Sequence, residues 1–317
     1  MDTPTVSIIT PSFNQADFLE QTLRSVLEQD YPRIEYWVMD GGSSDNSREI
    51  IQRYADGLAG WVSEPDQGQA DGINKGIKCA TGEVIAWLNS DDLYRPGAIA
   101  SAVQALQENP QASFVFSDVD SIDSQGSTFN CMHYGDWGLT ELMSFHIIGQ
   151  PGVFMRRSAL EQAGLLDTSY HYLLDHHLWL RLAAISEPLY VPATIWAAAR
   201  MHEGAKNVAQ AAGFGPEAIR LAEWIESDPR FQSLASQMHH KIWAGAYRFN
   251  GFYQMEAGKP AQSLKMYWKS FTQHPGTALK DWRRIGYALL SALGFKSART
   301  AFYKARKTRF QGGTNPR

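Results

Sequence analysis

The sequence predicts a doubly wound α/β domain with a mostly parallel sheet, followed by an all-helical region. Two observations predict it. Strand-like and helix-like patterns alternate over residues 5–120, the order that places helices on both faces of a parallel sheet. From about residue 215 the strand patterns stop, and helical patterns continue to the end. We therefore predict two domains, residues 1–210 and residues 211–317.

Short-range patterns predict the elements of the first domain. β-Branched apolar runs indicate strands, and apolar residues three and four positions apart indicate helices. The expected strands are residues 6–10, 36–40, a short strand within 60–68, 83–89 and 113–123. The expected helices are residues 15–29, 47–55, 69–81 and one beginning near Pro96. A turn, strand and helix follow over residues 149–164, then a helix over 172–185 and an extended segment over 187–202.

Composition excludes several classes of protein. The chain has 317 residues, of which 44% are apolar and 20% charged, as in an ordinary globular protein. Its net charge of -4 implies no nucleic-acid partner. Cys79 and Cys131 stand in no metal-ligand spacing, which fits a reducing compartment and argues against a disulfide scaffold or a zinc knuckle. We see no signal peptide and no run near the about 18 apolar residues of a membrane span, so we expect a cytoplasmic protein.

Acidic residues follow the ends of several predicted strands. Asp40 ends the second strand, Asp91 and Asp92 follow the fourth, and Asp118 and Asp120 end the fifth. In doubly wound sheets, ligands bind at the carboxyl ends of the strands. The sequence therefore predicts a ligand site at one edge of the sheet.

The pair Asp91–Asp92 in the stretch WLNSDDLY has two interpretations. One acid could cap the helix near Pro96, or the pair could hold a divalent cation. No GxxxxGK[ST], strand-linked GxGxxG or GxSxG motif is present, so diphosphate charge would have to be met by a cation held by carboxylates. For the stretch DGGSSD, we expect Gly41 and Gly42 to supply positive φ and Ser43 or Ser44 to cap the next helix.

Two further residues are candidates for chemistry. Asp175 in YLLDHHLWLRL has apolar flanks, which predict partial solvation, the setting in which a carboxyl pKa rises toward that of a general base. A solvated helical residue is the plainer interpretation. His202 follows an apolar strand and by itself indicates only a core or surface histidine.

Five blocks, taken in order, resemble the family 2 glycosyltransferases of the GT-A fold, which build bacterial surface polysaccharides. The blocks are VSIITPSFNQADFLEQTLRSVLEQDYPRIEYWVMDGGSSDNS, SEPDQGQADGINKGIKCATGEVIAWLNSDD, GQPGVFMRRSAL, LLDHHLWLRL and ARMHEGAKN. The resemblance covers about residues 5–210. It implies a Rossmann-like GT-A sheet with helices on both faces, and it leaves the helical remainder uncovered.

The resemblance also implies roles by position. Asp175 is the general base, Gln150 faces the donor sugar and acceptor, and Asp92 with His202 binds Mg²⁺ or Mn²⁺. The implied nucleotide-binding residues are Pro11, Phe13, Asp40, Asp71, Lys75 and Asp91. Two departures stand out: Leu174 occupies the position where many relatives carry Glu, and the metal motif reads SDD rather than the commoner DxD.

The implied function is a metal-dependent, inverting transfer of a hexosyl or N-acetylhexosaminyl group. The donor is a nucleoside-diphosphate sugar, with UDP favoured, and the acceptor is a glycan or a lipid-linked sugar. The alternative is an inactive nucleotide-sugar-binding or scaffold protein that uses the helical region for partners. A nucleotidyltransferase is disfavoured because the first turn, TPSFNQ, lacks a basic glycine-rich loop.

The C-terminal end of the chain is basic. Residues 276–317 hold ten of the 29 Lys and Arg residues and one of the 33 acids. This segment is either a helical hairpin packed on the body or an interfacial segment on an anionic membrane. Because acceptors in polysaccharide assembly are often lipid-linked, we expect peripheral contact through residues 276–310 with the inner face of the cell membrane.

Overall fold

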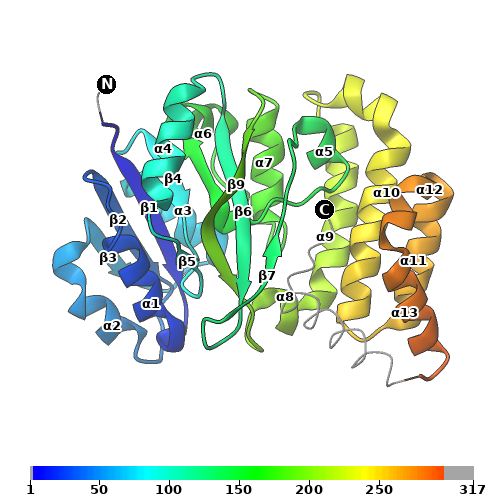
Figure 1. Ribbon diagram of the computed structural model, residues 1–317, viewed down its shortest axis with the longest axis horizontal. Coiled ribbons are helices and arrows are strands. Elements are labelled where there is room, and N and C mark those ends of the chain that lie inside the picture. Colours follow the sequence, from blue (N-terminus) through cyan, green and yellow to red (C-terminus); the bar gives the residue numbers. More distant parts are fainter. Residues whose placement is uncertain (1–2, 296–317) are drawn as a thin grey trace. The chain divides into compact units, whose positions relative to one another are not determined.

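A computed structural model describes residues 3–295 of the chain (Figure 1). It consists of two compact units. The sheet unit comprises the chain up to residue 139 together with residues 148–200. The helical unit comprises residues 140–147 together with the chain from residue 201 onward. The expected division at residue 210 concerns independently folding domains and stays a prediction, because a compact unit need not fold alone.

One sheet runs through the sheet unit in the order β3-β2-β1-β4-β8-β6-β9-β5, with β7 paired to β6. The strands are β1 (Val6–Ser12), β2 (Ile34–Asp40), β3 (Gly60–Ser63), β4 (Val84–Trp87), β5 (Leu93–Tyr94), β6 (Phe114–Ile122), β7 (Thr128–Met132), β8 (Val153–Arg156) and β9 (Leu189–Arg200). The four strands β3, β2, β1 and β4 are parallel. Strand β8 then pairs antiparallel with both β4 and β6. The predicted α/β class of the GT-A type is confirmed, and β8 and β7 add antiparallel pairing that the sequence patterns do not predict.

The helices of the sheet unit pack through apolar stripes. They are α1 (Ala16–Leu27), α2 (Ser47–Arg53), α3 (Gln69–Cys79), α4 (Ala98–Glu108), α6 (Arg157–Ala163) and α7 (Leu174–Ala183), with short 3-10 turns η1 (Ala55–Gly57) and η2 (Gln150–Gly152). In α1, Leu19, Leu23 and Val26 are fully buried. On β4, Trp87 is buried and stacks on Trp179 of α7, with ring centroids 5.2 Å apart. Aromatic and aliphatic side chains thus fill the space between the sheet and its helices.

The helical unit is built from α8 to α13. Their bounds are α8 (Lys206–Ala209), α9 (Ala211–Ser227), α10 (Gln232–Glu256), α11 (Pro260–Gln273), α12 (Pro275–Ala278), η3 (Leu279–Asp281) and α13 (Trp282–Ala292). The end of α5 (Leu139–Met143) and the residues after it join this unit. There Phe145 packs against Phe249, with ring centroids 6.1 Å apart, and its carbonyl accepts a hydrogen bond from Arg248.

The basic C-terminal segment and the absence of a membrane span are both expected from the sequence. The basic segment 276–310 begins in α12 and α13, but residues 296–317 lie outside the described part of the chain. Within residues 3–295, no helix is both long enough and apolar enough to cross a membrane.

Candidate active site

The carboxyl ends of β1, β2 and β4 meet at one edge of the sheet. In the parallel register Ser12 is level with Asp40, and Ile9 is level with Trp87. The turn after β2 and the loop after β4 therefore lie on either side of the end of β1. This is the edge at which the acids of the sequence predict a ligand site.

In the turn after β2, Asp40 is a structurally satisfied acid. Its side chain is 2% exposed. It accepts hydrogen bonds from the Ser43 amide at 3.0 Å, from the Ser43 hydroxyl at 2.5 Å and from the Ser63 hydroxyl at 2.7 Å. Three donors satisfy most of the roughly four lone-pair sites of a carboxylate. Asp40 thus holds the turn in shape whether or not a nucleotide is bound.

The expected capping of the helix after this turn is wrong. The N-cap residue of α2 is Asn46, without a side-chain cap bond. Ser43 is instead occupied by Asp40, and Asp45 accepts from the Ser47 amide at 3.0 Å. Of the two glycines only Gly42 has positive φ, at 80°. At Gly41, a Cβ would lie 2.8 Å from an Asp66 carboxylate oxygen, so a larger residue would have to displace the Asp66 side chain.

In the loop after β4, Asp92 is buried with an exposure of 6%. One carboxylate oxygen accepts from the Arg200 backbone amide at 2.9 Å, and the other accepts from the Asn89 side chain at 3.3 Å. Burial, and then the neighbouring charge of Asp91, raise the pKa of Asp92 well above its ordinary value. These two neutral donors leave part of the cost of desolvating the charge unbalanced, and a nearby cation would offset it.

The helix-cap interpretation of Asp91 and Asp92 is wrong. The helix that follows, α4, has Gly97 as its N-cap in the left-handed conformation, with φ of 75° and no side-chain cap bond. The short strand β5 lies between the acids and the helix. Pro96 precedes the helix rather than opening it, because Gly97 makes the turn.

Arg200 at the end of β9 holds this loop, and the sequence analysis does not identify it. The residue is 3% exposed. Its backbone amide donates to the Asp92 carboxylate, and its Nε donates to the Asp91 carbonyl at 2.9 Å. Burial lowers the pKa of Arg200 while the two aspartates raise it. One residue therefore fixes both the carboxylate and the backbone of the acidic pair.

The other nitrogen atoms of the Arg200 guanidinium are also hydrogen-bonded. They donate to the Gln21 side-chain oxygen at 2.8 Å and to the carbonyls of residues 123–124 at 3.2 Å each. The guanidinium also lies over the Phe18 ring, 4.9 Å from its centroid. A usable signal was present in the sequence: an arginine closing the apolar run IWAAAR is expected to be buried and fully hydrogen-bonded.

An amide network connects the loop to the block that begins at Gln150. Gln150 is 8% exposed, and it donates to the Trp87 carbonyl at 2.7 Å. Its side-chain oxygen accepts from Asn89 at 3.2 Å, and Asn89 in turn accepts from Gln69 at 2.6 Å. Since Asn89 also donates to Asp92, Gln150 and Asp92 share one partner. Asn89 and Gln69 are further site residues that the sequence analysis omits.

Asp175 lies in the first turn of α7, half-buried, and its carboxylate accepts from the His176 amide at 2.7 Å. The pKa of Tyr134 indicates which residues lie near Asp175. Burial raises the pKa of Tyr134, and the charges of Asp118 and Asp175 raise it further. A Cβ on Gly149 would lie 2.2 Å from the Tyr134 hydroxyl. Asp175 is thus in the same region as the block that begins at Gln150.

The remaining predicted residues occupy varied positions. Pro11 is buried in β1, whereas Phe13 is 60% exposed just beyond it. Lys75 pairs with Glu64 at 3.0 Å and with Asp71 at 3.6 Å. The Glu64 hydrogen bond is the main cause of the raised pKa of Lys75.

His202 belongs to the helical unit, two residues beyond Arg200. Its role as a metal ligand stays a prediction.

The prediction that Asp118 and Asp120 end the fifth expected strand is wrong. Asp118 and Asp120 do not end their strand, because β6 continues to Ile122. Asp120 forms an ion pair with Arg95 at 2.5 Å, and Asp118 bonds to His133 at 2.6 Å. These two acids belong to a different set of contacts from the loop after β4.

The residues of that loop fit a hard divalent cation. An ionised carboxylate offers about four lone-pair sites, and Arg200 and Asn89 use two of those on Asp92. Oxygen ligands, with further positions filled by water or phosphate oxygens, are the surroundings that Mg²⁺ and Mn²⁺ prefer. Burial raises the pKa of Asp92, and a bound cation would favour its ionised form.

Comparison with known proteins gives consistent results. Residues 7–162 match the family described as glycosyl transferase family 2. "Uncharacterized glycosyltransferase Rv1514c" of Mycobacterium tuberculosis is 32% identical over 192 residues, covering 59% of this chain and 72% of that protein. The "Putative teichuronic acid biosynthesis glycosyltransferase TuaG" of Bacillus subtilis is 30% identical over 169 residues, covering 52% and 66%.

Solved structures share the fold. Residues 1–349 of TarS from S. aureus, in complex with UDP-GlcNAc, superpose with a TM-score of 0.59 at 15% identity, covering 99% of this chain and 93% of that one. The mannosyltransferase PcManGT from Pyrobaculum calidifontis, in complex with GDP-Man and Mn²⁺, has a TM-score of 0.62 at 20% identity, covering 98% and 86%. At these identities the likeness concerns the fold.

Proposed function

This chain belongs to glycosyltransferase family 2, and from that membership we propose a specific reaction for it. It transfers a hexosyl or N-acetylhexosaminyl group from a nucleoside-diphosphate sugar, with UDP-sugars favoured, to a glycan or lipid-linked acceptor in polysaccharide assembly. The relative named for teichuronic acid biosynthesis supports a role in polysaccharide assembly. The neighbour in complex with UDP-GlcNAc supports the donor class, and the one with GDP-Man keeps the base open.

The observation that carries the proposal is the buried carboxylate of Asp92. Its pKa is raised, and two neutral amide donors hold it in one orientation. A protein that only bound a neutral sugar would gain nothing from a desolvated acid. A diphosphate, in contrast, requires a cation, and Asp92 with Asp91 would hold it. His202 is proposed as a further metal ligand. Held there, Mg²⁺ or Mn²⁺ would supply positive charge to offset the charge that develops on the departing diphosphate.

The chain's own residues perform the remaining work. Asp175 accepts the proton of the acceptor hydroxyl as that oxygen attacks the anomeric carbon. The bond from this carbon to the diphosphate oxygen breaks on the opposite side, so the configuration inverts. Gln150 is positioned through Asn89 and faces the donor sugar and the acceptor.

The nucleoside is held by residues at the ends of β1 and β2. The exposed ring of Phe13 and the buried Pro11 line the nucleobase pocket with the turn that Asp40 holds. Asp91 lies toward the ribose. Asp71 and Lys75 border the donor from α3, and their mutual ion pair fixes both side chains.

A thermal-shift panel of nucleotide sugars, with and without Mn²⁺, tests the proposal. We expect one UDP-sugar to raise the melting temperature only when Mn²⁺ is present, and the same sugar to release UDP slowly by hydrolysis. The matched control is Asp56→Asn, which changes an exposed acid in η1 and should keep the full shift. If no nucleotide sugar shifts the melting temperature in the presence of Mn²⁺, the proposal is wrong.

We also propose that the helical unit contacts an anionic membrane from the cytoplasmic side. α13 buries Tyr287 and Ala288 but exposes a second apolar face. Its exposed members are Trp282, Leu289, Leu290 and Leu293. Arg283 lies over the Trp282 ring, 5.2 Å from its centroid. An exposed apolar face beside arginines is typical of interfacial helices.

Vesicle flotation tests this contact. The full chain should float with vesicles containing anionic lipid and should remain unbound with purely zwitterionic ones. Trp282→Ala should weaken flotation. Ile185→Ala removes an exposed apolar side chain of the sheet unit and should leave flotation unchanged. Flotation that does not depend on anionic lipid would contradict the proposed contact.

A further inference from the structure

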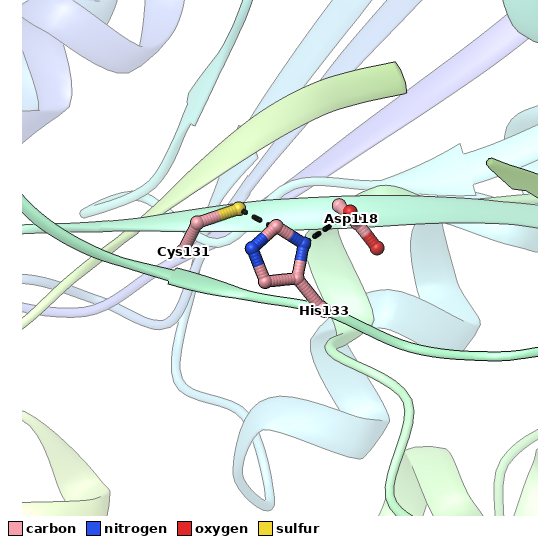
Figure 2. Close-up of side chains that lie close together, drawn as sticks. All are labelled: Asp118, Cys131 and His133. Atoms are coloured by element: carbon pink, nitrogen blue, oxygen red, sulfur yellow. Dashed lines mark hydrogen bonds and ion pairs between the residues drawn. The ribbon is translucent and has the colours of Figure 1, made fainter. Parts of the chain in front are cut away.

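The hairpin of β6 and β7 brings together three side chains of different chemistry: Asp118, Cys131 and His133 (Figure 2). The antiparallel register pairs Val119 with Met132 and Asp120 with Cys131. One step further along the hairpin, Asp118 meets His133. Because side chains alternate between the two faces of a strand, Cys131 and His133 point to the same face as Asp118.

The distances within the cluster are short. His133 Nδ1 lies 2.6 Å from an Asp118 carboxylate oxygen and 3.9 Å from the Cys131 sulfur. One ligand atom from each residue lies within 4.8 Å of the other two. Three ligands about 2.0–2.3 Å from a tetrahedral ion are roughly 3.3–3.6 Å apart. The cluster reaches this geometry if the nitrogen and the oxygen separate by about 0.7 Å and the sulfur moves inward.

Asp118 is oriented for this role by groups outside the cluster. Its other carboxylate oxygen accepts from the Tyr134 amide at 3.0 Å and from the Tyr190 hydroxyl at 2.7 Å. The side chain is 5% exposed. Two donors on one oxygen leave the second oxygen directed at His133. Fixing a ligand through its outer contacts is the arrangement found around protein metal sites.

We propose that Asp118, Cys131 and His133 bind a divalent cation of the zinc class, at a site separate from the loop of Asp92. Thiolate and imidazole ligands select Zn²⁺, and Co²⁺ as its substitute, over Mg²⁺ and Mn²⁺. The site would have three protein ligands, with water in the fourth position. Solvent has access, because the His133 side chain is 51% exposed.

Binding requires a proton balance. Burial, followed by the charges of Asp120 and Asp118, raises the pKa of the Cys131 thiol to about 12. The thiol therefore carries its proton when no cation is bound. On binding, the sulfur–metal bond forms, the thiol proton leaves to solvent, and His133 bonds the cation through Nδ1, which must then carry no proton. Affinity should accordingly increase with pH.

A Co²⁺ titration of the full-length protein tests the proposal. A cobalt–thiolate bond produces a sulfur-to-metal charge-transfer band in the near ultraviolet, which oxygen ligands do not. We expect this band to saturate at one Co²⁺ per chain, to disappear on addition of Zn²⁺ and to persist in excess Mg²⁺. It should be absent in Cys131→Ser, a change that keeps side-chain size at a partly exposed position.

The chain provides matched controls. Cys79→Ser removes the other free thiol, which is exposed on α3, and should retain the band. Asp92→Ala should retain it too, because the sites are separate. Tyr190→Phe removes the hydroxyl bond to Asp118 but keeps the ring, and should weaken Co²⁺ binding about 10–100-fold. No band in the unmodified protein, or a band that survives Cys131→Ser, would overturn the proposal. None of these measurements depends on sugar transfer.

Discussion

The turns that follow β2 and β4 each bury one carboxylate, but they stabilise it by different means. Asp40 is 2% exposed and receives three donors, two of them hydroxyls. Asp92 is 6% exposed, receives two amide donors and has Asp91 as its neighbour. Equal burial therefore does not mean equal function. Hydrogen-bond donors of the fold satisfy the first acid, whereas the second has fewer donors and a raised pKa.

The largest effect is expected from Asp92→Ala. If this acid holds the cation, transfer should fall by more than about 10³-fold and should no longer depend on Mn²⁺, because the diphosphate charge is then unopposed. Nucleoside diphosphate release over a Mn²⁺ series measures this. Near-normal transfer in the variant would show that Asp92, like Asp40, only stabilises its turn.

Asp175 lies outside both turns. Changing it should affect the chemical step without affecting donor binding. Asp175→Asn keeps the shape of the side chain but removes the base, so kcat should fall by about 10³-fold. Donor binding in the presence of Mn²⁺, followed by thermal shift, should be unchanged. A variant that turns over normally would show that another residue takes the acceptor proton.

Arg200→Lys tests whether the loop after β4 depends on support from β9. Lysine cannot reproduce the guanidinium contacts with Asp91, Gln21 and residues 123–124. We expect the Mn²⁺ concentration for half-maximal transfer to rise about 10–100-fold. The free energy of unfolding should fall by on the order of 2 kcal/mol.

Arg156→Lys is the matched control for this change. Arg156 also donates to backbone carbonyls, those of Leu106, Asn109 and Ala112, but at the far end of α4. Its variant should lose stability in urea unfolding without changing the Mn²⁺ dependence. If both variants change the Mn²⁺ dependence equally, Arg200 does not specifically support the loop after β4.

The smallest effect is expected in the turn after β2. Ser63→Ala removes one of the three donors to Asp40 and should lower the free energy of unfolding by about 1 kcal/mol. The Mn²⁺ dependence of transfer should not change, since this acid does not hold the cation. Urea unfolding and the same Mn²⁺ series measure the two quantities. A changed Mn²⁺ dependence would contradict the distinction between the turns.

Local patterns predicted much of this arrangement. The alternation of apolar runs located β1, β2, β4 and α1 to within a few residues, and the carboxyl-end rule placed Asp40 and the acidic pair at one edge. Errors arose at turns, where the backbone conformation decided which group each side chain bonds. Ser43 was expected to cap a helix but bonds to Asp40, and Pro96 was expected to open α4, where Gly97 makes the turn.

The sequence by itself determined the α/β class, the family and the acids that terminate the parallel strands, because each depends on residues close together in the chain. Only the tertiary structure decided how many hydrogen-bond donors each buried acid receives. Asp92 is separated from Arg200 by 108 residues, and Asp118 meets His133 through the register of a hairpin. Burial and donor count set the charge state of a carboxylate, and both are properties of the packed chain that no local pattern encodes.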